Sequence, residues 1–491
     1  MLIKSLPDAK KLIFLILIFF IFQILSFIGY LWPMVSTIVF WLIILTAVTF
    51  GSHKTEYGFL VLFFEFLSGH EGHMFEFAGI SLRLGLFLAV MTVWLIKKIV
   101  SQGWTSFLIL DYCGRFFLFL FLFIILVSFI QGLVKNDVIL AIKDLINYSY
   151  FLLIFPLAEF LKDKQFFKKA STLSKSAIIG IGVLTVFIFL CFGYGLFQVH
   201  DGFYWWWRGV AIGKATDTGT NFFRIVTSAH LLILPLFLII LSFLVEWKSL
   251  KKNRKTIILL FFLASLPLVI NFSRAYFLGI LAGLVLLVCG LNWQRGLVFC
   301  LTVIFVLAFE FIFLFVIVNG GEALRGLSFF QSRLNSIAVP ERELSSLSRM
   351  NILPKLTEKI KQEPIFGQGL GQTVSYFDPI TNQEKQTFHL DWGYLEIWVE
   401  TGLFGLLSYL MILAYIFKKG FEKIKTLNQD RLKKRLVVGL LSGLLALMVA
   451  TITGPFLFHP LGIFYVILTI LIIVNIDQYD AKSNNSNCHV E

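Results

Sequence analysis

Long uninterrupted apolar stretches recur from one end of the chain to the other, and they restrict the fold more than any other feature. Of the 491 residues, 58% are hydrophobic and only 14% are charged. In lipid every backbone N–H and C=O group needs a partner within the protein, so a membrane span is either a helix or part of a closed barrel. Because the apolar residues run continuously instead of alternating with polar ones, the pattern excludes the barrel. We predict an all-α, polytopic helical membrane protein with about 12–14 transmembrane helices.

The apolar stretches divide into fourteen candidate spans, and a count of twelve is the alternative. The stretch 57–69 is short for a bilayer and holds Glu65, so we expect a half-span or a tilted one. The first stretch is too long for a signal peptide and lacks a small-residue cleavage site, so we expect it to remain as an anchor. The spans are 12–32, 34–51, 57–69, 78–96, 115–133, 139–161, 176–196, 225–246, 256–270, 274–290, 297–318, 395–417, 435–454 and 458–475.

The net charge of +13 is concentrated in a few short connections. Residues 162–175 hold five lysines and one aspartate, and 247–255 hold five basic residues and no acid. Residues 417–435 hold eight basic and two acidic residues. If the spans alternate in direction, these connections share one side, and the positive-inside rule makes that side cytoplasmic together with both termini. The excess charge therefore indicates topology, and we expect no nucleic-acid partner.

The sequence offers no metal-binding pattern, and we expect neither a metal nor a cofactor. "GHEGH" (69–73) lacks the spacing of a helical zinc site. The five cysteines lie in or near spans or in the tail, where they act as small apolar side chains instead of a disulfide framework.

Two long connections face outward and set the domain organisation. The first, 197–224, contains three consecutive tryptophans (205–207), which either anchor in the headgroup layer or stack on sugar rings. The second is 319–394, and long loops on a rigid scaffold are where function concentrates. We divide the chain into N-terminal helices with the first outer loop (1–224), a membrane core with the second (225–475), and a cytoplasmic tail (476–491).

The second outer loop contains a predicted amphipathic helix, "SRMNILPKLTEKIKQEP" (348–364). Apolar residues recur in it at helical spacing: Leu353, Leu356 and Ile360. Ser348 is its candidate N-cap, and Pro354 requires either a start near Ile352 or a kink. The following "PIFGQGLGQ" lacks the strand context of a nucleotide-binding fingerprint, so we interpret it as a tight turn.

The mouth of the next span, "HLDWGYLEIWVETGLFG", combines a histidine with acidic residues. If a helix begins near His389, then His389, Gly393, Glu396 and Glu400 form one stripe along it. Asp391 lies at the same mouth, and a nearby carboxylate raises the basicity of a histidine, as a general base requires. The alternative is an interfacial histidine among solvated acids.

Several arginines lie at the predicted outer face. Arg274 stands at the turn between two spans and Arg349 at the start of the loop helix, while Arg208 and Arg224 lie in the first outer loop. A guanidinium group makes paired hydrogen bonds to phosphate, so these residues are candidate anion clamps. The alternative for Arg274 is a snorkelling side chain. Glu310, inside a span, is either functional or paired with an arginine.

Three of these stretches, in order, resemble the O-antigen ligase and polymerase superfamily of bacterial membrane enzymes. They are "FSRAYFLGILAG", "SRMNILPKLTEKIKQEPIFGQGLGQ" and "HLDWGYLEIWVETGLFG". The resemblance covers roughly 225–475. Where the family often has Asn after the histidine, this chain has Leu390 and then Asp391, and it has more predicted spans than a typical ligase.

The resemblance implies a multi-pass protein of the bacterial inner membrane that takes a glycan from an undecaprenyl-diphosphate carrier at the outer face. Arg274 and Arg349 would hold the diphosphate, and His389 would take the proton from the attacking acceptor hydroxyl. Arg208, Arg224, Asp391 and Glu400 would complete the substrate-binding set. The acceptor would be lipid A core, a second lipid-linked glycan or a protein, and membrane lipids would surround the chain. The alternative is a lipid-linked glycan flippase or another polytopic transporter.

Overall fold

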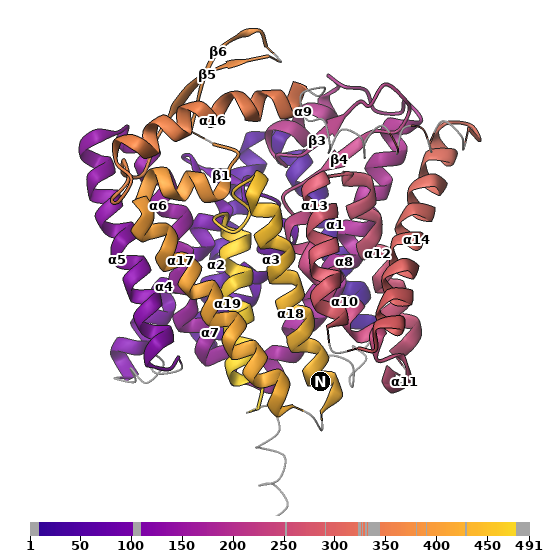
Figure 1. The fold of residues 1–491 in the computed structure, drawn as a ribbon, viewed down its shortest axis with the longest axis horizontal. Helices are drawn as coiled ribbons and strands as arrows, with labels where there is room; N and C mark the ends of the chain where they lie inside the picture. Colours follow the sequence, from indigo (N-terminus) through magenta and orange to yellow (C-terminus); the bar gives the residue numbers. More distant parts are fainter. Residues whose placement is uncertain are drawn as a thin grey trace, which may run out of the picture.

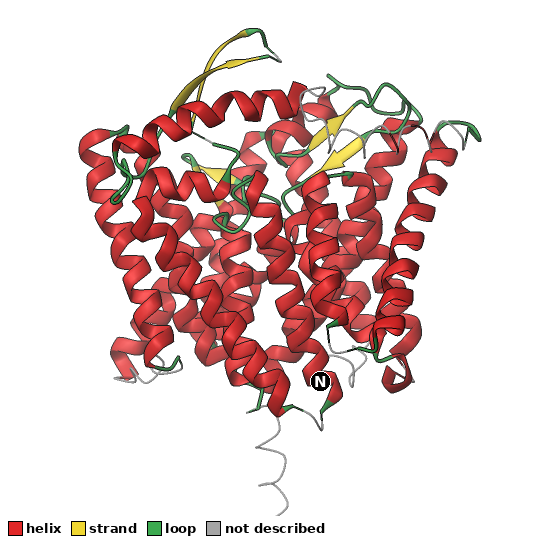
Figure 2. Ribbon diagram, in the orientation of Figure 1, coloured by secondary structure: helices red, strands yellow, loops and turns green. Residues whose placement is uncertain are grey.

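The protein is a bundle of helices that run between two faces, with a thin layer of short elements over one face (Figure 1). The computed structural model describes residues 9–101, 110–250, 253–289, 291–322, 326, 328, 331, 344–379, 381–388, 390–427 and 430–477. Helices dominate the described part, and the strands form only short hairpins (Figure 2). The predicted all-α polytopic fold is confirmed.

Each of the fourteen predicted spans corresponds to a helix. The N-terminal ones are α1 (Ala9–Leu31), α2 (Pro33–His53), α3 (Thr55–Ser68), α4 (Leu82–Ser101), α5 (Tyr112–Lys135), α6 (Val138–Ser149) with η2 (Tyr150–Leu153) and α7 (Ile154–Phe160), and α8 (Lys164–Gly193). The later ones are α10 (His230–Val245), α12 (Arg254–Asn271), α13 (Arg274–Val288), α14 (Trp293–Val318), α17 (Gly393–Thr426), α18 (Arg431–Ala450) and α19 (Pro460–Asn475).

Ten described segments are long and apolar enough to cross a membrane, and α10, α13 and α19 are shorter apolar helices. The third span, α3, has 14 residues, as the short stretch around Glu65 predicted. The Glu65 carboxylate accepts a hydrogen bond of 2.8 Å from Nε of Arg83 in α4, and each side chain is only 2% exposed. Breaking a buried ion pair is costly, so this pair ties α3 to α4.

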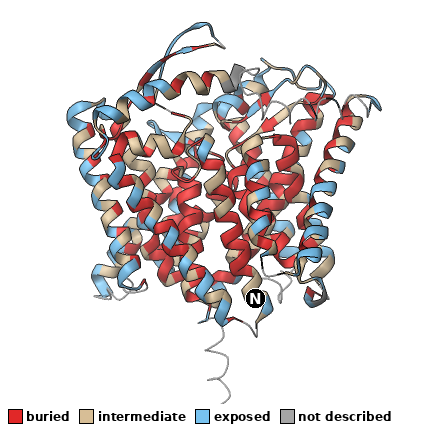
Figure 3. Ribbon diagram, viewed as in Figure 1, coloured by how far each residue is buried: buried red, intermediate tan, exposed pale blue. Residues whose placement is uncertain are grey.

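Buried residues concentrate along the centre of the bundle (Figure 3). There α10 and α13 both pack against α18. Small residues allow close approach: a Cβ on Gly279 would lie 2.7 Å from the backbone oxygen of Ala446, and one on Gly443 would lie 2.6 Å from Cβ of Pro235. Close backbone packing is a main source of helix association in lipid.

Short elements cover the face opposite the end where α1 begins, which the charge pattern predicts to be the outer face and which we call the outer face below (Figure 1). They are α9 (Gly202–Gly209), the hairpin β3 (Lys214–Thr216) and β4 (Arg224–Val226), the helix α16 (Leu344–Gln362), and the hairpin β5 (Val374–Asp378) and β6 (Gln383–Thr387). A further hairpin, β1 (Glu76–Phe77) and β2 (Ile80–Ser81), joins α3 to α4, and α11 (Trp247–Leu250) and η5 (Thr451–Thr453) are short turns between spans.

The tryptophan run lies in α9, and its predicted role is wrong for two of its members. Trp206 is 2% exposed and Trp207 is 0% exposed, so neither faces lipid headgroups or a sugar. Nε1 of Trp206 donates to Oγ of Ser26 in α1 at 3.1 Å. Only Trp205 is exposed. The two buried indoles instead attach the first outer loop to the bundle.

The amphipathic helix is confirmed, but its start is not where the sequence suggested. It begins at Leu344, so Ser348 is not an N-cap and Pro354 lies inside the helix. The hydroxyl of Ser348 instead donates to the hydroxyl of Tyr376 at 3.2 Å. A small core separate from that of the bundle holds α16 in place, and its buried members are Ile352, Leu356, Val374, Tyr376, Leu390 and Val399.

Helix α17 is interrupted at Gly402, whose φ of 70° and ψ of −174° are not helical. The glycine-rich segment after α16 fills the interruption with backbone hydrogen bonds. Gln368 N donates to Val399 O at 2.7 Å, and Leu403 N donates to Pro364 O at 2.9 Å. Backbone groups freed at membrane depth must find partners elsewhere in the protein, and the inserted segment supplies them.

The inserted segment is the predicted tight turn. Gly367, Gly369 and Gly371 all have positive φ, between 74° and 86°. The turn also contacts α5, because Leu370 N donates to Ser128 O at 3.0 Å. The turn therefore joins the outer layer to two membrane helices.

We predict that Gly402→Ala destabilises the protein. A Cβ at this position would lie 2.1 Å from the backbone oxygen of Ile365, and its φ of 70° is strained for alanine. Strain of this kind costs on the order of 1–3 kcal/mol before the clash is counted. Thermal unfolding of the purified protein should show a lower midpoint for Gly402→Ala. Gly209→Ala is the control, since no atom lies within 4 Å of its Cβ position. Equal midpoints for the two variants would contradict the role of the interruption.

Candidate functional site

The β3–β4 hairpin presents basic side chains on one face. Directly paired residues share a face of a hairpin, and residues two apart on a strand also share one. The register pairs Lys214 with Val226 and Thr216 with Arg224, so Lys214 and Arg224 project from the same face. The other face, formed by Ala215 and Ile225, is buried against the bundle.

Lys214 lies among charges from four other places in the chain. Neighbouring protein atoms remove part of the water around its ammonium group, and this desolvation lowers its pKa from the usual 10.5. The residue as a whole is nevertheless exposed. The positive charges of Arg208 and Arg349 lower the pKa further, whereas the carboxylates of Asp391 and Glu71 raise it. Two of the predicted clamps, Arg208 and Arg349, and the predicted Asp391 are thus brought together. The hairpin residue at the centre, Lys214, was missed, because its position depends on tertiary contacts.

Arg349 is fixed on α16 by contacts with the start of α17. Its Nε lies 3.8 Å from Oδ2 of Asp391, and its backbone oxygen accepts a hydrogen bond of 3.0 Å from Nε1 of Trp392. Both members of the ion pair are partly exposed, so the pair is worth little to stability by itself. Its geometric effect is to hold a guanidinium group at the mouth of α17.

The predicted helix start at His389 is wrong. Asp391 has a φ of 55°, and α17 begins at Gly393, so the stripe that runs through Gly393, Glu396 and Glu400 does not extend back to His389. His389 itself lies outside the described residues. The predicted effect of Asp391 on His389 therefore stays a prediction, while the observed partner of Asp391 is Arg349.

Arg274 is the first residue of α13 and is half-buried. Phe272, two residues earlier, adopts a left-handed conformation with φ 49°, which ends α12 just before α13 begins. Nε of Arg224 donates to the backbone oxygen of Asn271 at 3.1 Å. Arg224 therefore lies against the turn that leads into Arg274, which links the hairpin to the third predicted clamp.

Buried polar side chains lie below the hairpin. His230, at the start of α10, has Nδ1 3.1 Å from Nδ2 of Asn271 and Nε2 3.1 Å from Oγ1 of Thr185. The ring of His70 packs edge-on against Trp207, with 5.5 Å between ring centroids. The contact between His230 and Asn271 holds the turn before Arg274 in a fixed position.

The "GHEGH" segment divides its side chains among different partners. His70 faces the buried layer, Glu71 acts on Lys214, and His73 bonds to Glu76. Within the ranges the structure describes, no group of three or more metal-ligating side chains could hold an ion.

Glu400 lies in a separate buried cluster next to the glycine-rich turn. The hydroxyl of Tyr148 donates to its Oε2 at 3.5 Å, and Asp144 in α6 accepts a hydrogen bond of 2.8 Å from Gly371 N. The neighbouring Glu396 lies within the field of both Asp144 and Asp391, so this cluster adjoins the mouth of α17. Glu400 is 2% exposed, and its observed contacts are with protein groups.

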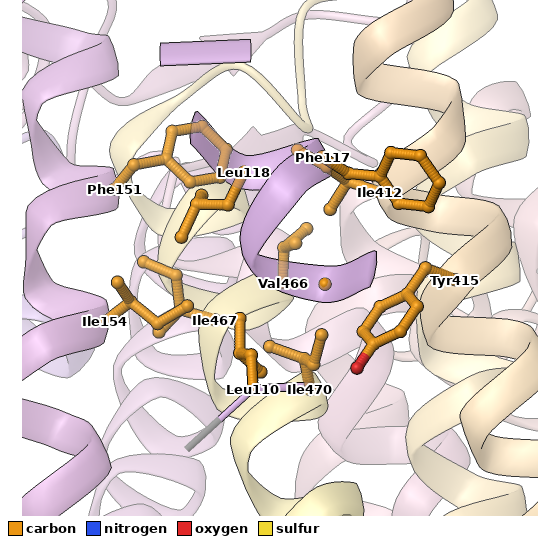
Figure 4. Close-up of a pocket in the computed structure, with 11 residues that line it drawn as sticks. Leu110, Phe117, Leu118, Phe151, Ile154, Ile412, Tyr415, Val466, Ile467 and Ile470 are labelled. Carbon is orange, nitrogen blue, oxygen red and sulfur yellow. The ribbon is translucent and has the colours of Figure 1, made fainter. Parts of the chain in front are cut away.

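Two other features lie apart from this face. Glu310 accepts a hydrogen bond of 2.7 Å from the hydroxyl of Ser265. A pocket between α5, α17 and α19 is lined almost entirely by apolar side chains, with the hydroxyl of Tyr415 as its side-chain polar group (Figure 4). That lining offers no charge to bind a phosphate or orient a sugar.

One comparison with known protein families matches part of this region. Residues 259–410 match the family model described as O-antigen ligase. The match confirms the resemblance seen in the sequence, and it includes Arg274, Arg349 and His389 but not the α9–β4 region. No curated protein matches the chain.

We predict that Lys214 makes anion binding at this face dependent on pH. Its lowered pKa means that it loses its positive charge at a lower pH than a free lysine, so affinity for inorganic diphosphate should fall as the pH rises through that range. Lys214→Arg should show a smaller fall, because arginine keeps its charge. The titration of diphosphate itself is common to both proteins and cancels in the comparison.

The measurement is calorimetric binding of diphosphate to the purified protein between about pH 7 and pH 10.5, a range set by the usual lysine pKa. Lys385→Arg, on the exposed β6 strand, is the matched control and should follow the wild-type curve. Identical curves for wild type and Lys214→Arg would remove Lys214 from the site.

Proposed function

We propose that this chain, whose residues 259–410 match the O-antigen ligase family model, is a membrane enzyme that transfers glycans from an undecaprenyl-diphosphate-linked donor at the outer face of the bacterial inner membrane. The observation that carries this proposal is the convergence of Arg208, Lys214 and Arg349 on one face of the bundle. Such a group of cations suits a diphosphate whose lipid tail remains in the bilayer.

The basic residues would act on the leaving group. As the acceptor oxygen bonds to the anomeric carbon, the bond from that carbon to the diphosphate oxygen breaks, and the diphosphate keeps the electron pair. Guanidinium groups of Arg274 and Arg349 would stabilise the growing negative charge through paired hydrogen bonds. Arg208, Lys214 and Arg224 would extend this positive field, so the mechanism requires no metal.

His389 would accept the proton of the acceptor hydroxyl. Two neighbours in the chain support this role: Leu390 is buried in the small outer core, and Asp391 contacts Arg349. Residues 390 and 391, which directly follow His389 in the chain, are thus held against α16 and Arg349.

The basic connections between spans support a cytoplasmic location for both termini, which puts α16 and the hairpins outside. The acceptor would be lipid A core in a ligase or a second lipid-linked glycan in a polymerase. Surface polysaccharide of a deletion strain distinguishes the two: single capped repeats indicate a polymerase, and full-length chains left on the carrier indicate a ligase.

We predict that Arg274→Ala and Arg349→Ala each reduce glycan transfer by at least about tenfold, since a hydrogen bond to a charged group contributes about 1.5–3 kcal/mol. Lysine at either position should restore transfer only in part, because a point charge cannot make paired contacts. Transfer from a defined lipid-linked donor is the measurement, with membrane protein levels measured in parallel. Arg295→Ala, at the exposed opposite end of α14, is the control. Full transfer by both alanine variants would remove the diphosphate clamp.

We predict that His389→Ala and His389→Gln reduce transfer by about 10²–10⁴-fold, the usual contribution of a general base. Both should still bind the donor, because the basic residues are unchanged. Asp391→Asn should have a milder effect. Donor binding and transfer are measured side by side with EDTA present. Wild-type turnover by His389→Gln would mean that the histidine is only an interfacial residue.

A further inference from the structure

A second group of basic side chains lines a pocket at the opposite end of the bundle, where α10, α13, α17 and α18 come together. The pocket has a volume of about 350 Å³, within the range of small-molecule sites. Its charged lining residues are Glu246, Arg431, Lys434 and Arg435. The proposed glycan transfer uses none of them.

The positive charges exceed the negative ones in this pocket. Glu246 pairs with Arg435, whose Nη2 and Nε lie 3.2 and 3.3 Å from its Oε1. That pair is mostly buried, so Arg435 is held by a protein carboxylate. Arg431 and Lys434 lie three residues apart in the first turn of α18 and so share a helix face. With Arg435 they give the lining three basic side chains against the one carboxylate of Glu246.

The remaining lining is apolar. Leu286, Ile424, Val438 and Leu441 form the inner wall, and Phe421 is 43% exposed. A pocket with cations at one end and apolar side chains along its wall suits an amphiphile with an anionic headgroup and an aliphatic chain. It lies at the ends of membrane helices, where lipid headgroups meet hydrocarbon.

We propose that this pocket binds the phosphate headgroup of an anionic phospholipid from the leaflet on this side, which the charge pattern assigns to the cytoplasm. Arg431 and Lys434 contact the phosphate, and an acyl chain lies along the wall formed by Leu286 and Val438. Because the pocket joins α13 to α18 and α17, the bound lipid stabilises the packing of these helices.

The positive-inside rule by itself concentrates basic residues at this end of the bundle. The test must therefore distinguish a specific lipid site from general attraction by this positive charge. Lys418 and Lys425 on α17 provide the control, because both are exposed on the same side and neither lines the pocket. The double variants Arg431→Ala/Lys434→Ala and Lys418→Ala/Lys425→Ala remove the same charge.

The purified protein in detergent is incubated with phosphatidylglycerol, phosphatidylcholine or inorganic phosphate, and bound lipid is measured by native mass spectrometry. Wild type and the α17 control should bind phosphatidylglycerol in preference to phosphatidylcholine, and millimolar inorganic phosphate should not displace it. The α18 double variant should bind phosphatidylglycerol at least about tenfold more weakly, since two charge-assisted contacts are lost. Phosphatidylglycerol should raise the unfolding temperature of wild type and control only.

Equal binding by the two double variants would overturn the proposal, because generic charge would then explain it. Displacement by inorganic phosphate would indicate a soluble phosphate ligand and would overturn the lipid assignment. Arg431→Gln/Lys434→Gln repeats the test with longer side chains in case the alanine variant fails to fold. Glycan transfer is not required for any of these readouts, so failure here is distinguishable from failure of the proposed function.

Discussion

The arrangement of the outer face depends on the interruption of α17 at Gly402. A break in a membrane helix leaves amide and carbonyl groups without partners, and the turn after α16 supplies them from Pro364 to Gly369. The same turn bonds to α5 through Leu370 and through Asn136, whose Nδ2 donates to Leu370 O at 2.8 Å. The outer loop is therefore attached within the bundle, and α16 carries Arg349 on a fixed base.

Among the residues that the structure describes, no carboxylate forms a close ion pair with Arg349 or Lys214. Arg349 has Asp391 at 3.8 Å, a separation too long for a strong paired contact, and Lys214 has Glu71 and Asp391 only as electrostatic neighbours. A site whose positive groups are already positioned by the protein loses little free energy to reorganisation when an anion binds. Two strong internal carboxylate pairs would have left less of this positive field for a bound anion.

The spans could be predicted from the sequence because the length of an apolar stretch is a local property, and the bilayer thickness sets the length that a span needs. Prediction from the sequence failed where tertiary contacts determine the position of a residue. Trp206 and Trp207 looked interfacial but are buried, Trp206 against α1 and Trp207 against His70. The start of α17 differs from the prediction because Asp391 adopts a left-handed backbone conformation that no apolar pattern indicates. Lys214 could not be recognised, because only the pairing of β3 with β4 and the placement of α16 bring it to Arg349.

The lengths of the central helices explain why a polar layer lies at this face. Helix α13 has 15 residues and α10 has 16, which at 1.5 Å per residue gives about 22–24 Å against a hydrocarbon core of about 30 Å. The remaining depth must be covered by other segments whose polar groups are satisfied internally. At the outer end these are the β3–β4 hairpin and the hydrogen bonds among His230, Asn271 and Arg224. Arg274, the first residue of the short α13, therefore adjoins this polar layer, which is where the proposed donor would place its diphosphate.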